Sequence, residues 1–174
     1  MKDRIFWVRG PWPGKLAVAA RPRGGDWLDD ELSSWRRAGI RTVVSLLTAK
    51  EEEDLELEKE GAAARAQGLK FLSLPVRDRQ VPESEAEVES AIQKLDATLD
   101  SGKNVLVHCR QGVGRSGLLA ACLLVNRGVA AQAAVDELSA VRGTLVPETP
   151  EQRRWIERYA ARVEAAHSHA ESKR

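Results

Sequence analysis

The chain has 174 residues, of which 43% are hydrophobic and 30% charged, and its formal net charge is +1. This length suits one domain with its own core, and the composition is that of a globular chain rather than a disordered one. The balanced charge excludes a general attraction to nucleic acid or anionic membranes. The start lacks the apolar segment of a signal peptide, and no apolar run reaches the ~18 residues of a membrane span.

The first elements are predicted from short apolar runs and from capping residues. Residues 15–22 predict a buried strand and a turn. A helix follows, with Asp26 as its N-cap, apolar residues at helical spacing, and Gly39 as its end. Residues 41–47 form a β-branched apolar run, which is typical of a strand buried on both faces.

An acidic segment follows this strand. Thr48 and Glu51 stand at the spacing of a capping box, so they predict the start of a helix. We interpret the run of acids within 51–60 as a solvated helix face rather than as a functional acidic patch.

The remaining elements alternate in the same way. They are predicted as a strand at 70–76, a helix at 84–101, a strand at 104–108, and helices at 115–127, 130–141 and 150–164. The alternation predicts an α/β fold with a mostly parallel central sheet flanked by helices on both faces. We expect a single domain at 1–166 and a flexible tail at 167–174. Ligands of such sheets bind where strands give way to helices.

One strand-to-helix junction carries a glycine-rich loop, "HCRQGVGRSG". Gly112 and Gly114 allow successive backbone N–H groups to point inward as a nest for an anion, and the following helix directs its positive end there. Arg115 can grip two phosphate oxygens with its planar guanidinium. Cys109 lies at the start of the loop, where the positive field favours a thiolate placed to attack phosphorus. The predicted phosphate-binding residues are Arg110, Gln111, Gly112, Val113, Gly114 and Arg115.

Two other interpretations of this loop fail, because it lacks the Gly-Lys-Ser/Thr ending of an ATP-binding loop and the chain has no Cys-x-x-Cys pair. The alternative to a catalytic cysteine is a buried structural cysteine in a tight turn. The second cysteine, Cys122, falls in an apolar helix stripe and is assigned to the core. The two cysteines make neither a disulfide framework nor a zinc site, which favours a reducing cytoplasm.

The motif His108-Cys109-x-x-Gly112-x-x-Arg115-Ser116-Gly117 resembles the signature loop of the cysteine-dependent protein tyrosine and dual-specificity phosphatases. The resemblance extends loosely over 16–159. It is strongest to the compact dual-specificity type and the cyclin-dependent-kinase-associated phosphatase group. It implies hydrolysis of a phosphomonoester through a phosphocysteine intermediate, with no cofactor and no metal.

The resemblance also implies roles for individual residues. Asp78, 31 residues before the cysteine and in a loop after a strand, matches the general acid, although an ordinary loop acid is the alternative. Ser116 would donate a hydrogen bond to the departing thiolate, and His108 would orient the cysteine unless it is a plain core histidine. Gln152 matches a glutamine that helps to place the attacking water, whereas Glu148 stands where many tyrosine phosphatases have another glutamine.

The substrate class is less well defined by the sequence. A compact chain without insertions around the cleft favours a phosphorylated protein or peptide, with phosphotyrosine, phosphoserine or phosphothreonine. Phosphoinositides or inositol phosphates are the next candidates, followed by RNA 5′-phosphates and phosphosugars; a non-catalytic phosphate-binding module belongs to another class. No nucleic-acid or membrane partner is expected, and a monomer is compatible with the sequence.

Overall fold

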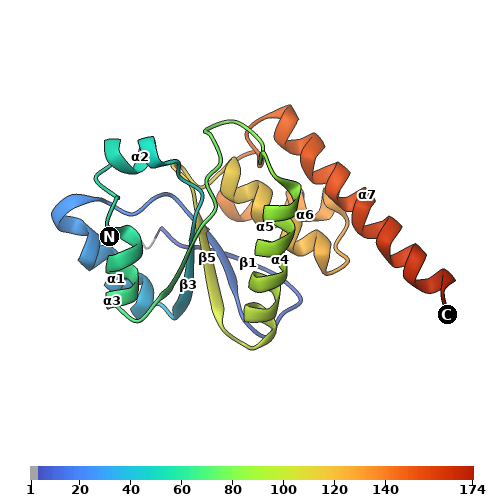
Figure 1. Cartoon of the computed structure of the whole chain (residues 1–174), viewed down its shortest axis with the longest axis horizontal. Helices are drawn as coiled ribbons and strands as arrows, with labels where there is room; N and C mark the ends of the chain where they lie inside the picture. Colours follow the sequence, from blue (N-terminus) through green and yellow to red (C-terminus); the bar gives the residue numbers. More distant parts are fainter. Residues whose placement is uncertain (1–3) are drawn as a thin grey trace.

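The computed structural model describes residues 4–174, which form a five-stranded sheet with helices on both faces (Figure 1). The strands, in the order in which they lie side by side, are β1 (Phe6–Val8), β2 (Leu16–Ala19), β5 (Asn104–His108), β3 (Ile40–Ser45) and β4 (Lys70–Ser73). All neighbours pair in parallel except β1, which pairs antiparallel with β2. The predicted α/β fold with a mostly parallel sheet is therefore confirmed, whereas β1 was not predicted.

Seven α-helices and one short 3₁₀ helix cover this sheet in the described residues. They are η1 (Gly25–Trp27), α1 (Leu28–Arg37), α2 (Ala49–Asp54), α3 (Glu60–Ala66), α4 (Glu85–Asp100), α5 (Arg115–Asn126), α6 (Ala131–Arg142) and α7 (Pro150–Ser172). Helices α1 and α3 pack on one face, and α4 and α5 cover the other, with α6 and α7 packed against α5 (Figure 1).

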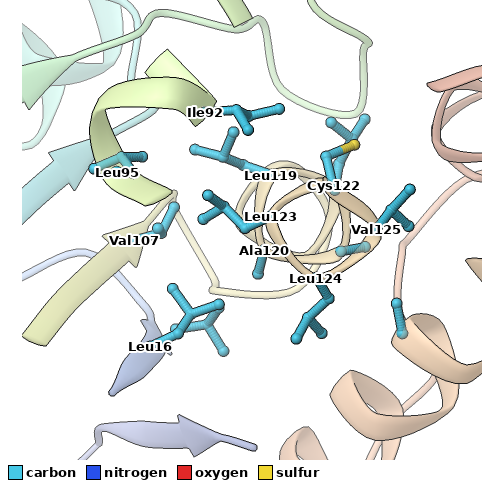
Figure 2. Packing of buried hydrophobic residues seen from close by; sticks show 14 of the residues in the cluster. Leu16, Ile92, Leu95, Val107, Leu119, Ala120, Cys122, Leu123, Leu124 and Val125 are labelled. Carbon is cyan, nitrogen blue, oxygen red and sulfur yellow. The ribbon is translucent and has the colours of Figure 1, made fainter. Parts of the chain in front are cut away.

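Helix α5 lies at the centre of the larger core. Its side chains are buried around the whole helix, and residues of β2, β5 and α4 surround it, including Leu16, Val107 and Ile92 (Figure 2). Cys122 is fully buried among them, as predicted, and burial raises the pKa of its thiol. The N-terminus of α5 is therefore fixed by packing along its length, and with it the loop that precedes the helix.

The helix boundaries confirm two capping predictions and correct a third, together with the predicted end of the last helix. The capping box of Thr48 and Glu51 is present, and Ser84 caps α4. Asp26 does not cap α1, because it lies within η1 and α1 begins only at Leu28. Helix α7 continues to Ser172, so most of the expected tail at 167–174 is helical; nothing in those residues breaks a helix.

The carboxyl ends of four parallel strands meet at one edge of the sheet. His108 pairs with Ala19 on one side and with Ser45 on the other, and Ser45 pairs with Ser73. The segments that leave β2, β3, β4 and β5 therefore converge above this edge. Every predicted site residue except Gln152 and the residues of α5 belongs to the end of β5 or to one of these segments.

Candidate active site

Cys109 lies directly after β5, at the floor of the loop 109–115, which we call the phosphate loop. Its sulfur accepts a hydrogen bond from the backbone N–H of Gly112 at 3.3 Å and lies 3.2 Å from the hydroxyl of Ser116. The residue is 3% exposed. Both neighbours can donate to a thiolate, and the start of α5 adds the positive end of the helix dipole.

The phosphate loop curls with its N–H groups inward, as the sequence predicts. Gly112 has φ +75°, and a Cβ there would come within 2.5 Å of the backbone of Ala19. Arg142 donates to the outward carbonyls of Gln111 at 3.1 Å and Gly112 at 2.8 Å. Since C=O and the next N–H point in opposite directions across a trans peptide, these contacts turn the N–H groups of Gly112 and Val113 into the loop.

Arg115 is held by a dense set of acceptors. Its Nη1 donates to Glu51 at 2.6 Å and to the Val76 carbonyl at 2.7 Å, while Nη2 donates to Glu51 at 2.9 Å and to Asp78 at 3.2 Å. Burial alone would lower the pKa of Arg115, but the hydrogen bond to Glu51 and the other acidic groups nearby together outweigh it and raise that pKa. Among the described residues the Nε–H has no acceptor. This N–H, with the Nη2 hydrogen that Asp78 now accepts, offers a phosphate two parallel donors.

Glu51 is a site residue that the sequence analysis missed. Its side chain is 11% exposed and grips Arg115 with both carboxylate oxygens. Burial alone would raise the pKa of Glu51, but hydrogen bonds from Arg115 and Thr48 outweigh it and lower that pKa. The interpretation of the acid run as a solvated face is therefore wrong at this position. The capping box and the end of the preceding strand were the signals that could have placed Glu51 at the site.

We expect Glu51→Gln to lower kcat/KM about tenfold and to destabilise the fold by about 1–3 kcal/mol, because Arg115 loses a charged acceptor. The folded-state pKa of Glu51 lies below its ordinary value of 4.5, so the carboxylate stabilises the fold above that pH and stops doing so as the pH falls through the lowered value. The difference in unfolding free energy between wild type and variant should shrink in acid. Denaturant titrations at several pH values measure it. The exposed Glu53→Gln on the same helix is the control, and a pH-independent difference would contradict this role.

His108 is buried and forms a second pair with a glutamate of the same acid run. Its Nε2 lies 2.6 Å from Glu60, and its Nδ1 lies 3.3 Å from the carbonyl oxygen of Cys109. Both side chains are at most 1% exposed, which makes Glu60 a second exception to the solvated face. His108 thus contacts both Glu60 and the backbone of Cys109, and its role in orienting the cysteine stays a prediction.

Asp78 lies in the segment 74–84, between β4 and α4, and its side chain faces the phosphate loop. Its carboxylate lies 3.2 Å from Nη2 of Arg115, in a turn closed by a bond from Gln80 N–H to the Arg77 carbonyl. Arg79, with φ +62°, turns outward and pairs with Glu148 at 2.9 Å. Asp78 is half exposed, so it can reach both the loop and solvent.

Gln152 is fully buried at the first turn of α7. Its Oε1 accepts from the N–H groups of Glu148 and Thr149, and its Nε2 donates to the Gln80 carbonyl at 3.1 Å. The amide therefore caps α7 and contacts the Asp78 segment. A Cβ on Gly114 would lie 3.1 Å from this amide, which places Gln152 beside the phosphate loop; its role in placing water stays a prediction.

The contacts of Arg79 and Gln152 join the Asp78 segment to the start of α7. We expect Arg79→Ala and Glu148→Ala each to lower kcat about two- to fivefold on substrates with poor leaving groups, since an exposed ion pair contributes little alone. The double variant should lose no more than either single one. Arg77→Ala, which breaks an exposed pair with Glu83 on the same segment, is the control. Additive losses in the double variant would show that the two side chains act separately.

Within residues 4–174, no group of three acidic, histidine or cysteine side chains could hold a metal ion. Over the same residues, no helix has the length and apolar character needed to cross a membrane.

Residues 4–172 match the family described as "Swiss Army Knife protein, DSP-PTPase phosphatase domain". Dual specificity protein phosphatase 2 of Homo sapiens is 37% identical over 80 residues, covering 45% of this chain and 26% of that protein. Cyclin-dependent kinase inhibitor 3 of Sus scrofa is 32% identical over 100 residues, covering 56% of this chain and 47% of that protein. The chain thus spans less than half the length of either relative.

A solved structure of kinase associated phosphatase, with its catalytic cysteine replaced by serine, superposes with a TM-score of 0.82 at 23% identity, over 92% of this chain and 96% of that one. The family match over residues 4–172, together with Cys109 and Arg115 in one loop, defines the class of cysteine-dependent tyrosine and dual-specificity phosphatases. Within that class the chain belongs to the DSP-PTPase phosphatase domain family, as the match over nearly all its length shows.

Proposed function

We propose that this protein hydrolyses phosphomonoesters in proteins, acting on phosphotyrosine and also on phosphoserine and phosphothreonine, in a reducing compartment such as the cytoplasm. One observation carries the proposal. The sulfur of Cys109 lies at the floor of an inward-facing loop, 3.3 Å from the Gly112 N–H and 3.2 Å from the Ser116 hydroxyl, with Arg115 beginning the following helix. A phosphoryl group in that loop faces a nucleophile from below and Asp78 from the side.

The reaction has two steps in this proposal. The Cys109 thiolate forms a bond to phosphorus while the ester P–O bond breaks, and protonated Asp78 gives its proton to the leaving oxygen. Water then attacks the phosphocysteine, Asp78 takes a proton from that water, and the P–S bond breaks. Ser116 donates a hydrogen bond to the departing thiolate. Inorganic phosphate leaves, and Cys109 and Asp78 return to their starting protonation states.

Inositol phosphates and phosphoinositides form the second candidate class. The observation that favours them is a set of arginines beside the phosphate loop, including Arg110 and Arg21, which suits a substrate with several anionic groups. Gln111 and Val113, which lie within the loop itself, carry no charge.

A substrate panel tests the proposal. Phosphotyrosine and phosphothreonine peptides, soluble inositol phosphates and phosphoinositide vesicles are compared by kcat/KM with a metal chelator present. We expect the peptides to be turned over fastest. Preference for an inositol substrate would replace the proposed substrate class, and binding without turnover of any ester would show a phosphate-binding module instead.

A further inference from the structure

A cavity of about 440 Å³ opens beside the phosphate loop, between the segment after β2, helix α1 and the start of the described chain. The residues that line it and bear charge are Arg4, Arg21, Arg23, Arg110, Asp30 and Glu31. We call it the arginine pocket. Of the residues that line it, only Arg110 belongs to the phosphate loop.

The pocket is joined to the phosphate loop through the backbone. The N–H of Arg21 donates to the carbonyl of Arg110 at 3.3 Å, and Gly112 packs closely against the Ala19 backbone. Ala19 itself pairs with His108, the residue before Cys109. The pocket and the nucleophile are therefore parts of one rigid edge of the sheet, and a substrate held in the loop can extend into the pocket.

The charges in the pocket favour an anion. Arg23 and Glu31 pair with each other at 2.7 Å, so their charges offset. Of the other charged side chains lining the pocket, three are arginines and one is Asp30. Among the described residues, neither Arg4 nor Arg110 forms an ion pair, and the guanidinium of Arg21 donates only to the Pro22 carbonyl. Arginine recognises phosphate and carboxylate through paired N–H donors, so an anionic oxo group is the ligand that fits.

The apolar residues that line the pocket indicate which kind of molecule bears the anionic group. Ile5, Ala19 and Trp35 give the pocket an apolar side, with Ala19 and Trp35 almost fully buried. The apolar stem of an amino-acid side chain packs on such a wall better than an inositol ring, which bears a hydroxyl or phosphate on every carbon. From the proposed protein phosphatase activity and this geometry, we infer that the arginine pocket binds a second anionic group, a phosphate or a carboxylate, on the same phosphopeptide.

The test compares peptides that differ only beside the phosphoresidue. One has neutral neighbours; the others carry a glutamate or a second phosphoresidue within three positions, on either side. We expect wild type to favour at least one anionic peptide about tenfold in kcat/KM, through a lower KM, with the preference falling as salt is added. The glutamate and phosphate arms distinguish the two sources of the anion.

The variants separate the pocket from the chemistry. Arg4→Gln with Arg21→Gln should abolish the preference and leave kcat/KM on the neutral peptide unchanged, whereas the exposed Arg158→Gln on α7 should change neither. Arg110 is left intact because it belongs to the phosphate loop. Turnover of the neutral peptide without any anionic preference, or a preference that survives the double variant, overturns the inference while the proposed function stands. If wild type turns over none of the peptides, both the inference and the proposed function are overturned.

Discussion

Cys109→Ser should lower turnover of any phosphomonoester about 10⁴-fold or more, as expected when a nucleophile is removed. A serine hydroxyl at this position is not ionised near neutral pH, so the attacking group is lost. The N–H of Gly112, the Ser116 hydroxyl and Arg115 stay in place, so the loop should still bind a phosphopeptide. Steady-state kinetics measure the first effect and isothermal calorimetry the second.

Cys122→Ala is the matched control, because the chain has only this other cysteine. Cys122 is fully buried in the core, and burial raises the pKa of its thiol. Its replacement should lower stability and leave kcat/KM unchanged. Peroxide should inactivate wild type and Cys122→Ala at the same rate, since a thiolate oxidises far more readily than a buried thiol. Retained activity in Cys109→Ser would exclude Cys109 as the nucleophile.

The local parts of the site could be predicted because their chemistry is contiguous in the sequence. The loop 109–115 has a cysteine at its start, an arginine at its end and, at Gly112, a positive φ that favours glycine, all within a few residues. The capping box of Thr48 and the N-cap of α4 at Ser84 are equally local, and both predictions are confirmed. The parallel sheet followed from the alternation of apolar runs with amphipathic ones.

The parts that were missed depend on contacts between distant segments. Glu51 and Glu60 looked like members of a solvated acid run, and only the packing of α2 and α3 over the sheet edge brings them to Arg115 and His108. Neither Cys109 nor its neighbours indicate which acids will face them. Arg142 supports the phosphate loop from α6 in the same way, 30 residues beyond the carbonyl it binds.

The strand β1 and the end of α7 were missed for a different reason. Three residues are too few to show an alternating pattern, and β1 forms because β2 offers it an antiparallel edge. The last turns of α7 are polar and exposed, so no apolar stripe marks them, although nothing there breaks a helix. Periodicity detects buried faces, and these segments have almost none.

Asp78→Asn should lower kcat/KM about 10²–10⁴-fold on phosphotyrosine and phosphothreonine peptides, the range that general acid catalysis contributes. An asparagine cannot give a proton to the leaving oxygen. Its side-chain oxygen can still accept from Nη2 of Arg115, which now bonds Asp78 at 3.2 Å, so the segment 74–84 should keep its place. An activated aryl phosphate leaves without a proton, so the loss on that substrate should be much smaller.

The pH dependence separates the two functional groups. Wild-type kcat/KM should give a bell-shaped pH profile, because the proposed mechanism needs a deprotonated nucleophile and a protonated acid. Asp78→Asn should flatten the basic limb and spare the acid limb. Glu83→Gln and Glu85→Gln are the controls, since these exposed acids lie at the end of the same segment and directly after it. If Asp78→Asn loses equal activity on good and poor leaving groups and keeps the bell-shaped profile, another acid donates the proton. The control variant whose profile loses the basic limb would then identify that acid.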